Sequence, residues 1–559
     1  MSAAAPAGAW SPPKPSPLAW RALVVLLIAM FMSLLDTTIV NVALQTIREN
    51  VNGAGHPAAS EDVLSWIISG YALAYGVALI PAGRLGDMFG HKWIFFGGLA
   101  LFTAASLACG LAQSDSQLIV FRVIQGLAAG TFTPAVTAYI QILFQGKVRG
   151  SAFAIMGAVI GVSSALGPIV GGLLIQAFGN TNGWRYIFGV NIPIGVVALI
   201  LAIIFVPGRK KLAQIAPSWS ASSSGGIDWL GLVLLAGALT AILVPLIEGQ
   251  QKGWPLWTYL SLAGGVVLIV LFALWERLTV RRNRSPLVPP HLFSHPAFTG
   301  GTILALVYFS AFTSIFFTIS LLWQAGLGHT ALESGLVSLP FAVGSIIGSA
   351  RSNPLAQRLG RNVLVIGTAL VVVGLGIVWL IFENVKPADL NAWQLLVPLF
   401  LAGLGNGLFI APNAQFIVAT VDPTEAGAAS GVISTMQRVG SAIGIAVIGS
   451  VLFGVAELSS IKGEVTKKLM AEVTKKVAAY MKTQTFDSAQ AAGQAAKSAA
   501  ARFAKELAPG ISKHDLAVHF ANAAAAAMGV SVLFAIAALL LVFVLPRRLQ
   551  QWGGAPGGH

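Results

Sequence analysis

Charged residues are scarce in this sequence of 559 residues. Asp, Glu, Lys and Arg together make up 10% of it, whereas hydrophobic residues make up 56%. A soluble globular chain carries about 25% charged and about 45–50% apolar residues. The composition therefore excludes an ordinary soluble fold. Since a membrane-spanning helix takes roughly 20 residues, the apolar fraction suffices for a polytopic membrane protein.

Cysteine is also nearly absent, because Cys109 is the only one and lies in an apolar run. A single cysteine excludes a disulfide framework and a CxxC metal site. The phosphate-binding pattern GxxxxGK[ST], the zinc pattern HExxH and the nucleophile pattern GxSxG do not occur in the sequence. We therefore expect no metal site, no bound cofactor and no enzymatic activity.

Apolar runs of about 20 residues recur along the chain and predict fourteen membrane-spanning helices. We place them at 19–42, 63–83, 93–112, 117–143, 150–177, 185–206, 228–247, 256–276, 297–323, 332–351, 362–382, 393–420, 425–453 and 521–545. Most Lys and Arg of the short loops fall on the side that holds both termini, so the positive-inside rule predicts cytoplasmic termini. The net charge of +14 follows from this topology and does not indicate nucleic-acid binding.

The two halves of the sequence resemble each other weakly. Gly126 and Gly130 align with Gly403 and Gly407, and the loop containing Gly90 aligns with the one containing Gly360. We predict an all-α integral membrane protein of two six-helix bundles with an inserted helix pair. The predicted divisions are a cytoplasmic tail (1–18), a first bundle (19–206), linkers with the inserted pair (207–296) and a second bundle (297–559).

The last predicted division includes an external segment, 454–520. Apolar residues recur there at a spacing of three or four, with lysines on the other faces, which is typical of a basic amphipathic helix. The apolar residues are Leu458, Ile461, Val465, Leu469, Val473, Val477 and Tyr480. The segment is either a solvated hairpin without a role in transport, a membrane-surface contact or a hydrophobic conduit.

Three charged residues lie at least five residues from either end of a predicted span, where such groups are costly and usually functional. Burial favours the neutral form of a carboxyl, so Asp36 either carries a proton or fixes helix packing through Thr37, Thr38 or Asn41. Arg122 cannot lose its charge; it either biases a nearby carboxylate or substrate, or anchors backbone carbonyls. Arg438 either faces a cavity or donates hydrogen bonds in helix packing.

Two glycine-containing runs indicate moving parts. In GRLGDMFGHK, Asp87 can cap a helix start or pair with a basic group, which would latch one conformation. The latch residues are Gly83, Arg84, Asp87, Gly90 and Lys92. In GPIVGG, the residues Gly167, Pro168, Gly171 and Gly172 favour close helix packing and a bend, with either a packing or a gating role.

Aromatic and polar residues in the spans could line a cavity between the bundles. Besides Arg438, the candidates are Asn41, Gln125, Tyr308, Phe312, Phe316 and Gln324. The same residues could instead face lipid or neighbouring helices.

Together these motifs resemble the fourteen-helix drug:proton antiporters of the major facilitator superfamily. The resemblance rests on LLDTTIVNVAL, GRLGDMFGHK, RVIQG, GPIVGG and WRYIFGVNIPIG, and covers about residues 19–453 and the last helix. It implies that fold, with Asp36 as proton site, Arg122 as coupling residue and Asp87 in a cytoplasmic latch. Met88, His91 and Gln357 depart from the family pattern, so the latch is expected to differ between the halves.

The function expected from this resemblance is proton-driven export of lipophilic or cationic drugs by a monomer in the cytoplasmic (inner) membrane. The proton gradient would be its only energy source, and its partners would be the small-molecule substrate, protons and the lipid bilayer. Export of a lipid or lipid-linked molecule is an alternative that the external segment favours. A non-transporting sensor or scaffold is an alternative of another class.

Overall fold

The computed structural model describes residues 15–53, 59, 61–215, 228–249, 252–282, 284–456, 470–480 and 489–547. Within these residues fourteen helices are long and apolar enough to span a membrane. They run Pro17–Val40, Trp66–Phe89, His91–Leu111, Asp115–Leu143, Gly146–Gly179, Thr181–Phe205, Trp229–Glu248, Leu256–Arg281, Pro296–Gln324, Leu332–Leu359, Asn362–Asn384, Ala392–Val418, Ala426–Leu452 and Ala517–Val544. The fourteen spans predicted from the sequence are confirmed.

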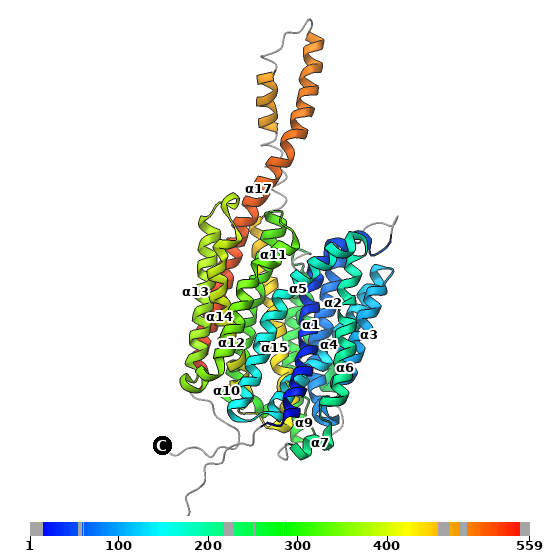
Figure 1. Cartoon of the computed structure of the whole chain (residues 1–559), viewed down its shortest axis with the longest axis vertical. Coiled ribbons are helices and arrows are strands. Elements are labelled where there is room, and N and C mark those ends of the chain that lie inside the picture. Colours follow the sequence, from blue (N-terminus) through cyan, green and yellow to red (C-terminus); the bar gives the residue numbers. More distant parts are fainter. Residues whose placement is uncertain are drawn as a thin grey trace, which may run out of the picture.

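Two groups of helices stand side by side (Figure 1). The first comprises α1 (Pro17–Asn50), α2 (Glu61–Phe89), α3 (His91–Leu111), α4 (Asp115–Leu143), α5 (Gly146–Gly189) and α6 (Asn191–Phe205). The second comprises α10 (Pro296–Leu321), α12 (Leu339–Leu359), α13 (Asn362–Asn384), α14 (Ala392–Val418), α15 (Ala426–Ala456) and α17 (Ala489–Leu541). The groups meet where α5 contacts α12 and α14, and where α15 contacts α2 and α4.

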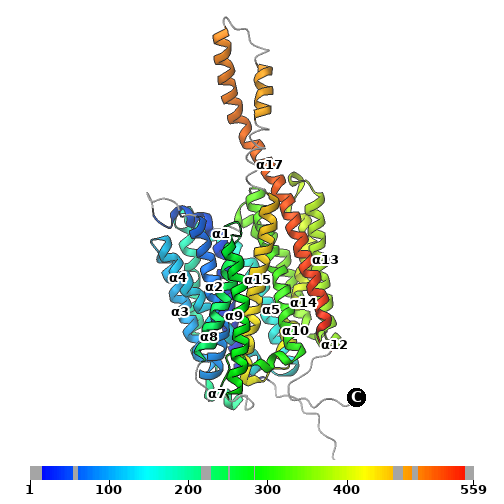
Figure 2. The same cartoon turned by 180° about the vertical axis from the view of Figure 1, so that it is seen from behind.

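The helices between the two groups in the sequence pack at their boundary. They are α7 (Arg209–Ile215), α8 (Trp229–Glu248) and α9 (Leu256–Arg281). α8 and α9 pack against each other, and α8 also contacts α2 and α15 (Figure 2). The inserted pair therefore touches both groups.

Short elements join or end the spans of the second group. They are η1 (Pro290–Ser294), η2 (Leu322–Gly326), α11 (Ala331–Val337), η3 (Pro387–Asp389), η4 (Pro423–Glu425) and η5 (Val542–Val544). α11 contacts α5 of the first group. In the first group, α5 itself holds parts of two spans, because Gly179 with φ of 78° breaks its helical backbone.

Glycines that align between the halves occupy equivalent places. A Cβ on Gly126 of α4 would meet the carbonyl oxygen of Tyr71 in α2, and one on Gly403 of α14 would meet that of Phe341 in α12. Gly130 and Gly407 face the backbones of Tyr75 and Ser345 in the same way. In each half, two glycines one turn apart thus bring an equivalent pair of helices into backbone contact, α2 with α4 and α12 with α14.

A helical hairpin projects from the bundle at the end opposite to the start of α1 (Figures 1 and 2). Its arms are residues 470–480 and the first part of α17, whose 53 residues span roughly 80 Å at about 1.5 Å per residue. Tyr480 packs edge-on against Phe503, with ring centroids 6.3 Å apart. Of the predicted amphipathic positions, Leu458, Ile461, Val465 and Leu469 lie outside the described residues.

The tight approach of α3 to α4 predicts a position-specific loss of stability. A Cβ on Gly98 would lie 3.0 Å from the Phe132 nitrogen and 3.1 Å from the Ala128 oxygen, whereas nothing lies within 4 Å of one on Gly97. We expect Gly98→Leu to lower the free energy of unfolding by about 1–3 kcal/mol, as overpacking does. Thermal unfolding of the purified protein in detergent measures the loss.

Gly97→Leu is the matched control, because it places the same side chain one residue away on an exposed face. Equal melting temperatures for the two variants would contradict the close packing of α3 on α4.

Candidate functional site

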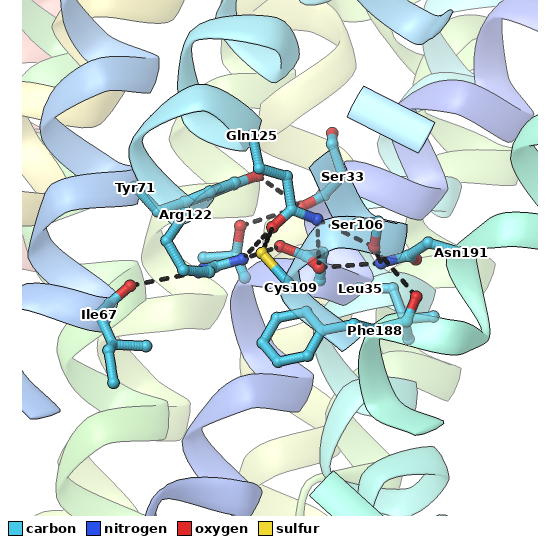
Figure 3. Close-up of polar contacts among 12 residues, drawn as sticks. Ser33, Leu35, Ile67, Tyr71, Ser106, Cys109, Arg122, Gln125, Phe188 and Asn191 are labelled. Carbon is cyan, nitrogen blue, oxygen red and sulfur yellow. Dashed lines mark hydrogen bonds and ion pairs between the residues drawn. The ribbon is translucent and has the colours of Figure 1, made fainter. Parts of the chain in front are cut away.

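Asp36 lies in a polar cluster inside the first helix group. Figure 3 labels its neighbours Arg122, Gln125 and Asn191. Met32, Ile39 and Ala43 recur with Asp36 at a spacing of three or four, so all four share one face of α1. All four are fully buried, with 0% exposure. The apolar packing of this face therefore carries the carboxyl group into the protein interior.

Three side-chain nitrogens donate to the Asp36 carboxylate. Arg122 Nη1 lies 2.6 Å from Oδ2, while Gln125 Nε2 and Asn191 Nδ2 lie 3.0 and 2.9 Å from Oδ1. The donors come from α4 and from the start of α6. An ionised carboxylate only accepts hydrogen bonds, so this set of donors suits the charged form.

Arg122 is held on several sides. Its Nε donates to the Ile67 carbonyl oxygen at 3.2 Å, and its Nη1 also donates to Gln125 Oε1 at 2.7 Å. Its guanidinium lies over the Tyr71 ring, 4.1 Å from the centroid. The side chain is 1% exposed, so the ion pair with Asp36 is closed off from solvent.

Ser106 of α3 joins the other members of the cluster. Its Oγ accepts from Gln125 Nε2 at 3.2 Å and from Asn191 Nδ2 at 3.0 Å, and donates to the Phe188 carbonyl oxygen at 3.0 Å. Sequence reasoning missed Ser106 and Asn191 as site residues. The signal for Asn191 was its place in WRYIFGVNIPIG; Ser106 gave none, because a lone serine in an apolar helix is common.

Asp36 is the carboxyl group of this cluster. A proton on either carboxylate oxygen would displace a donor and remove the negative charge opposite Arg122. Arg122 cannot lose its own proton, so if Asp36 were neutralised the guanidinium charge would need another partner or a different position.

The GPIVGG run of α5 lies between α1 and the second helix group. A Cβ on Gly167 would collide with the Thr38 side chain, two residues after Asp36. On the other side, Gly172 faces Leu332 and Pro168 faces Gly335, both on α11; Gly171 is buried. The run therefore contacts both α1 and α11.

Asp87 joins the two helix groups at the end of the bundle where α1 begins, which we call the terminal end. Its Oδ1 and Oδ2 each accept a backbone N–H, from Gly427 and Ala428, both at 2.9 Å. These amides open α15, so the carboxylate caps the positive end of a helix in the other group. A Cβ on Gly83 or on Gly427 would collide with the other residue's carbonyl oxygen. The contact therefore needs both glycines.

Other acidic and basic groups surround this contact. His91 Nε2 lies 3.2 Å from Asp87 Oδ1, and His291 Nε2 lies 3.0 Å from Glu425 Oε2. Burial raises the pKa of the Glu425 carboxyl above its ordinary value, against the opposing effect of His291. The start of α15 is thus approached by carboxylates of both helix groups.

The remaining expected latch residues do not bond to Asp87. Lys92 Nζ donates to the Ile203 carbonyl oxygen at 2.8 Å, within the first group. Arg84 lines a cavity of about 80 Å³ beside Asp228 and Pro286. Gly90, with φ of 99°, makes the turn into α3, which favours glycine.

The second half carries a neutral counterpart of this contact. Gln357, which aligns with Asp87, donates to Asn353 Oδ1 at 3.1 Å. Asn353 Nδ2 in turn donates to the Lys147 carbonyl oxygen and to Ser151 Oγ, both at 2.9 Å, in the first turns of α5. The two halves therefore clasp each other at the terminal end, through a carboxylate in one direction and amides in the other.

The residues expected to line a cavity make separate contacts in the structure. Tyr308 donates to Asn406 Oδ1 at 2.9 Å and stacks on Phe409, while Phe312 and Phe316 pack edge-on against each other. Gln324 donates to Ser320 Oγ at 2.7 Å. The Asn41 side chain lies outside the described ones. Arg438 lies over the Tyr75 ring, 3.9 Å from the centroid, at the boundary between the groups.

Comparison with known proteins identifies the family. Residues 26–445 match the family model described as Major Facilitator Superfamily. The chain belongs to the major facilitator superfamily. It is 34% identical over 451 residues to the "Probable actinorhodin transporter" of Streptomyces coelicolor, covering 80% of this chain and 75% of that protein.

Two further comparisons place this member of the superfamily. It is 32% identical over 428 residues to the "Multidrug resistance protein Stp" of Mycobacterium tuberculosis, covering 76% of this chain and 74% of that protein. The solved structure of the proton:xylose symporter XylE matches with a TM-score of 0.55 at 14% identity, over 77% of this chain and 87% of that one. At that identity the likeness to XylE shows the fold alone.

The buried ion pair predicts that replacing one partner lowers the stability of the protein and that replacing both restores part of it. We expect Arg122→Gln to lower the free energy of unfolding by about 3–5 kcal/mol, because it leaves a carboxyl group buried without its charge partner. Adding Asp36→Asn should recover a substantial part of this loss. Chemical unfolding of the purified proteins in detergent gives both values, and a double variant no more stable than Arg122→Gln would contradict the pairing.

The Asp87 cap predicts a shift in the opening of the terminal end. Asp87→Asn loses a charge-assisted contact, which is worth about 1.5–3 kcal/mol, so the open population should grow. Spin labels on the exposed residues Phe89 and Leu359, one in each group, report this by double electron–electron resonance in a Cys109→Ser background. Lys92→Gln is the control and should leave the distances unchanged; an unchanged distribution in Asp87→Asn would refute the latch.

Proposed function

We propose that this protein exports lipophilic drug-like molecules in exchange for protons by alternating access. The carrying observation is the buried pair of Asp36 and Arg122, with 2.6 Å between Nη1 and Oδ2. Ionisable groups at such depth are usually functional. The names of the relatives, which include an actinorhodin transporter and a multidrug resistance protein, support a drug as the substrate.

In this proposal Asp36 is the proton site and Arg122 the coupling residue. A proton arriving from outside neutralises Asp36 and frees Arg122 from its partner. The freed guanidinium disturbs Gln125 and the Tyr71 ring, which it contacts. Because Tyr71 and Tyr75 lie on α2, which packs against α15 of the other group, the change reaches the boundary where a substrate would bind. Proton and substrate then occupy the protein in alternation.

The two clasps at the terminal end supply the conformational part of the cycle. With Asp87 capping α15 and Asn353 bonded to the first turns of α5, that end is closed. Rocking of the groups would break both sets of bonds and open a path from the cytoplasm. The GPIVGG run of α5 would govern the opposite end through its contacts with α1 and α11.

We also propose the membrane and the orientation in which this cycle takes place. We place the protein in the cytoplasmic (inner) membrane with both termini in the cytoplasm, as the distribution of Lys and Arg over the loops predicts. The proton gradient is its only energy source in this proposal, with no bound cofactor, and a monomer suffices because the two helix groups come from one chain.

A second candidate function is export of a lipid or lipid-linked molecule. The hairpin formed by residues 470–480 and the first part of α17 favours it, because the hairpin extends well beyond the membrane-spanning bundle (Figure 1). Such an extension is more than a small drug needs to leave the membrane. Deletion of residues 456–515 separates the candidates: drug transport persists without the hairpin, whereas lipid transport depends on it.

Transport assays test the proposed coupling. In proteoliposomes with an imposed pH difference, we expect Asp36→Asn to reduce transport of fluorescein or rhodamine 123 by about tenfold or more and to abolish its dependence on the pH difference, because the proton site is lost. The control is Asp389→Asn, a neutralised carboxylate on the exposed surface, which should transport like the wild type. Full proton-driven flux in Asp36→Asn would overturn the proposal.

A further inference from the structure

Arg122 and Arg438 both lie within membrane spans, and their surroundings differ sharply. Arg122 has a carboxylate, an amide and a backbone carbonyl within hydrogen-bond distance and is 1% exposed. Arg438 lies near the middle of the span Ala426–Leu452 and is half-buried. A membrane arginine normally pairs with an acid or with backbone carbonyls.

Arg438 has neither kind of partner in the part of the chain that the structure describes. No carboxylate of those residues lies within 4.0 Å of its guanidinium, and no hydrogen bond from it is formed among them. Its guanidinium lies over the Tyr75 ring, with 3.9 Å between the guanidinium carbon and the ring centroid. A ring face offsets only part of the cost of a charge in this position.

The immediate surroundings offer further donors and no negative charge. Thr435 precedes Arg438 by one turn on the same face of α15. Its hydroxyl oxygen is buried without a hydrogen-bond partner in the described structure, and the residue is 1% exposed. The Tyr75 hydroxyl is already used, since it donates to Thr133 Oγ1 at 2.9 Å. Two unsatisfied groups on adjacent turns therefore point to a missing acceptor.

The acid that is linked to Arg438 through the two tyrosine rings already has a partner. Asp36 is paired with Arg122, which lies over Tyr71 at 4.1 Å; Tyr71 and Tyr75 lie 5.9 Å apart, and Tyr75 lies against Arg438. The pair and the two rings carry no net charge when Asp36 is ionised. Of the two arginines in this network, Arg438 is thus the one without a carboxylate partner among the residues that the structure describes.

We propose that Arg438 binds an acidic group of the transported molecule, a carboxylate or another oxyanion, with the Thr435 hydroxyl as a second donor. This inference rests on the proposed export function and names its substrate class. The planar guanidinium can hold an oxyanion by two parallel hydrogen bonds, and the fixed Tyr75 ring provides an aromatic face beside it. Lipid headgroups lie about 15 Å from the membrane midplane, half of a roughly 30 Å core, and so do not reach this depth.

An acidic substrate changes the charge balance of the exchange. When an anion leaves the cell and a proton enters, both movements carry positive charge inward. Exchange of a monovalent cation for one proton carries no net charge. Export of an acidic substrate should therefore run faster with a membrane potential that is negative on the cytoplasmic side.

Two dyes with the same ring system test the inference: fluorescein, an anion, and rhodamine 123, a cation. Full-length protein in proteoliposomes is assayed as wild type, Arg438→Gln and Arg438→Lys, with Arg351→Gln on the exposed surface of α12 as the matched control. We expect Arg438→Gln to lose about 10- to 100-fold of fluorescein flux, the range for one charge-assisted contact. Arg438→Lys should retain much of the flux, and Arg351→Gln all of it. A membrane potential that is negative on the cytoplasmic side should accelerate fluorescein export.

The outcomes separate this inference from the proposed function. Rhodamine 123 transport that needs Asp36 but is indifferent to Arg438, with no fluorescein transport, would overturn the acidic-substrate site and leave proton-driven export standing. Fluorescein transport that needs Arg438 but ignores the pH difference would overturn proton coupling and leave the site. Equal losses of both dyes in Arg438→Gln, or no transport of either dye by the wild type, would refute the inference.

Discussion

The structure depends on the cost of placing a charge inside a membrane. Asp36 and Arg122 meet that cost together, and the surrounding residues are arranged to keep them together: Gln125 and Asn191 satisfy the second carboxylate oxygen, and Ser106 orients both amides. The glycines that bring α2 and α4 into backbone contact fix the distance at which Tyr71 can cover the guanidinium. A change of one proton therefore acts on a network with little freedom to absorb it locally.

The contacts between the helix groups show how such a change can become a movement. At the terminal end the groups are joined by polar bonds to the first turns of two helices, α15 and α5, and these bonds break as units when the helices separate. The two joints differ in chemistry, since one uses the carboxylate of Asp87 and the other the amides of Asn353 and Gln357. The first joint uses a carboxylate side chain, whereas the second uses only neutral groups.

Much of this architecture could be predicted from the sequence, for a physical reason. Hydrocarbon demands long apolar helices, so the fourteen spans follow from composition alone, and a charge inside a span marks Asp36 and Arg122 as candidates. Their pairing could not be predicted without the family resemblance, because it depends on the relative rotation of α1 and α4. Asn191 and Ser106 were missed because small polar residues are tolerated in membrane helices for many reasons. The partner of Asp87 is a pair of backbone amides, which no side-chain pattern reveals.

The long helix α17 connects the hairpin directly to the last membrane span. It is continuous from Ala489 in the hairpin through the span that begins at Ala517, so roughly 40 Å of it stands outside the span at about 1.5 Å per residue. If an arm of that length moves with the span, tilting the second helix group by about 10° would swing its tip sideways by roughly 7 Å. A label near the tip of the hairpin would therefore be displaced by any tilt of the second helix group.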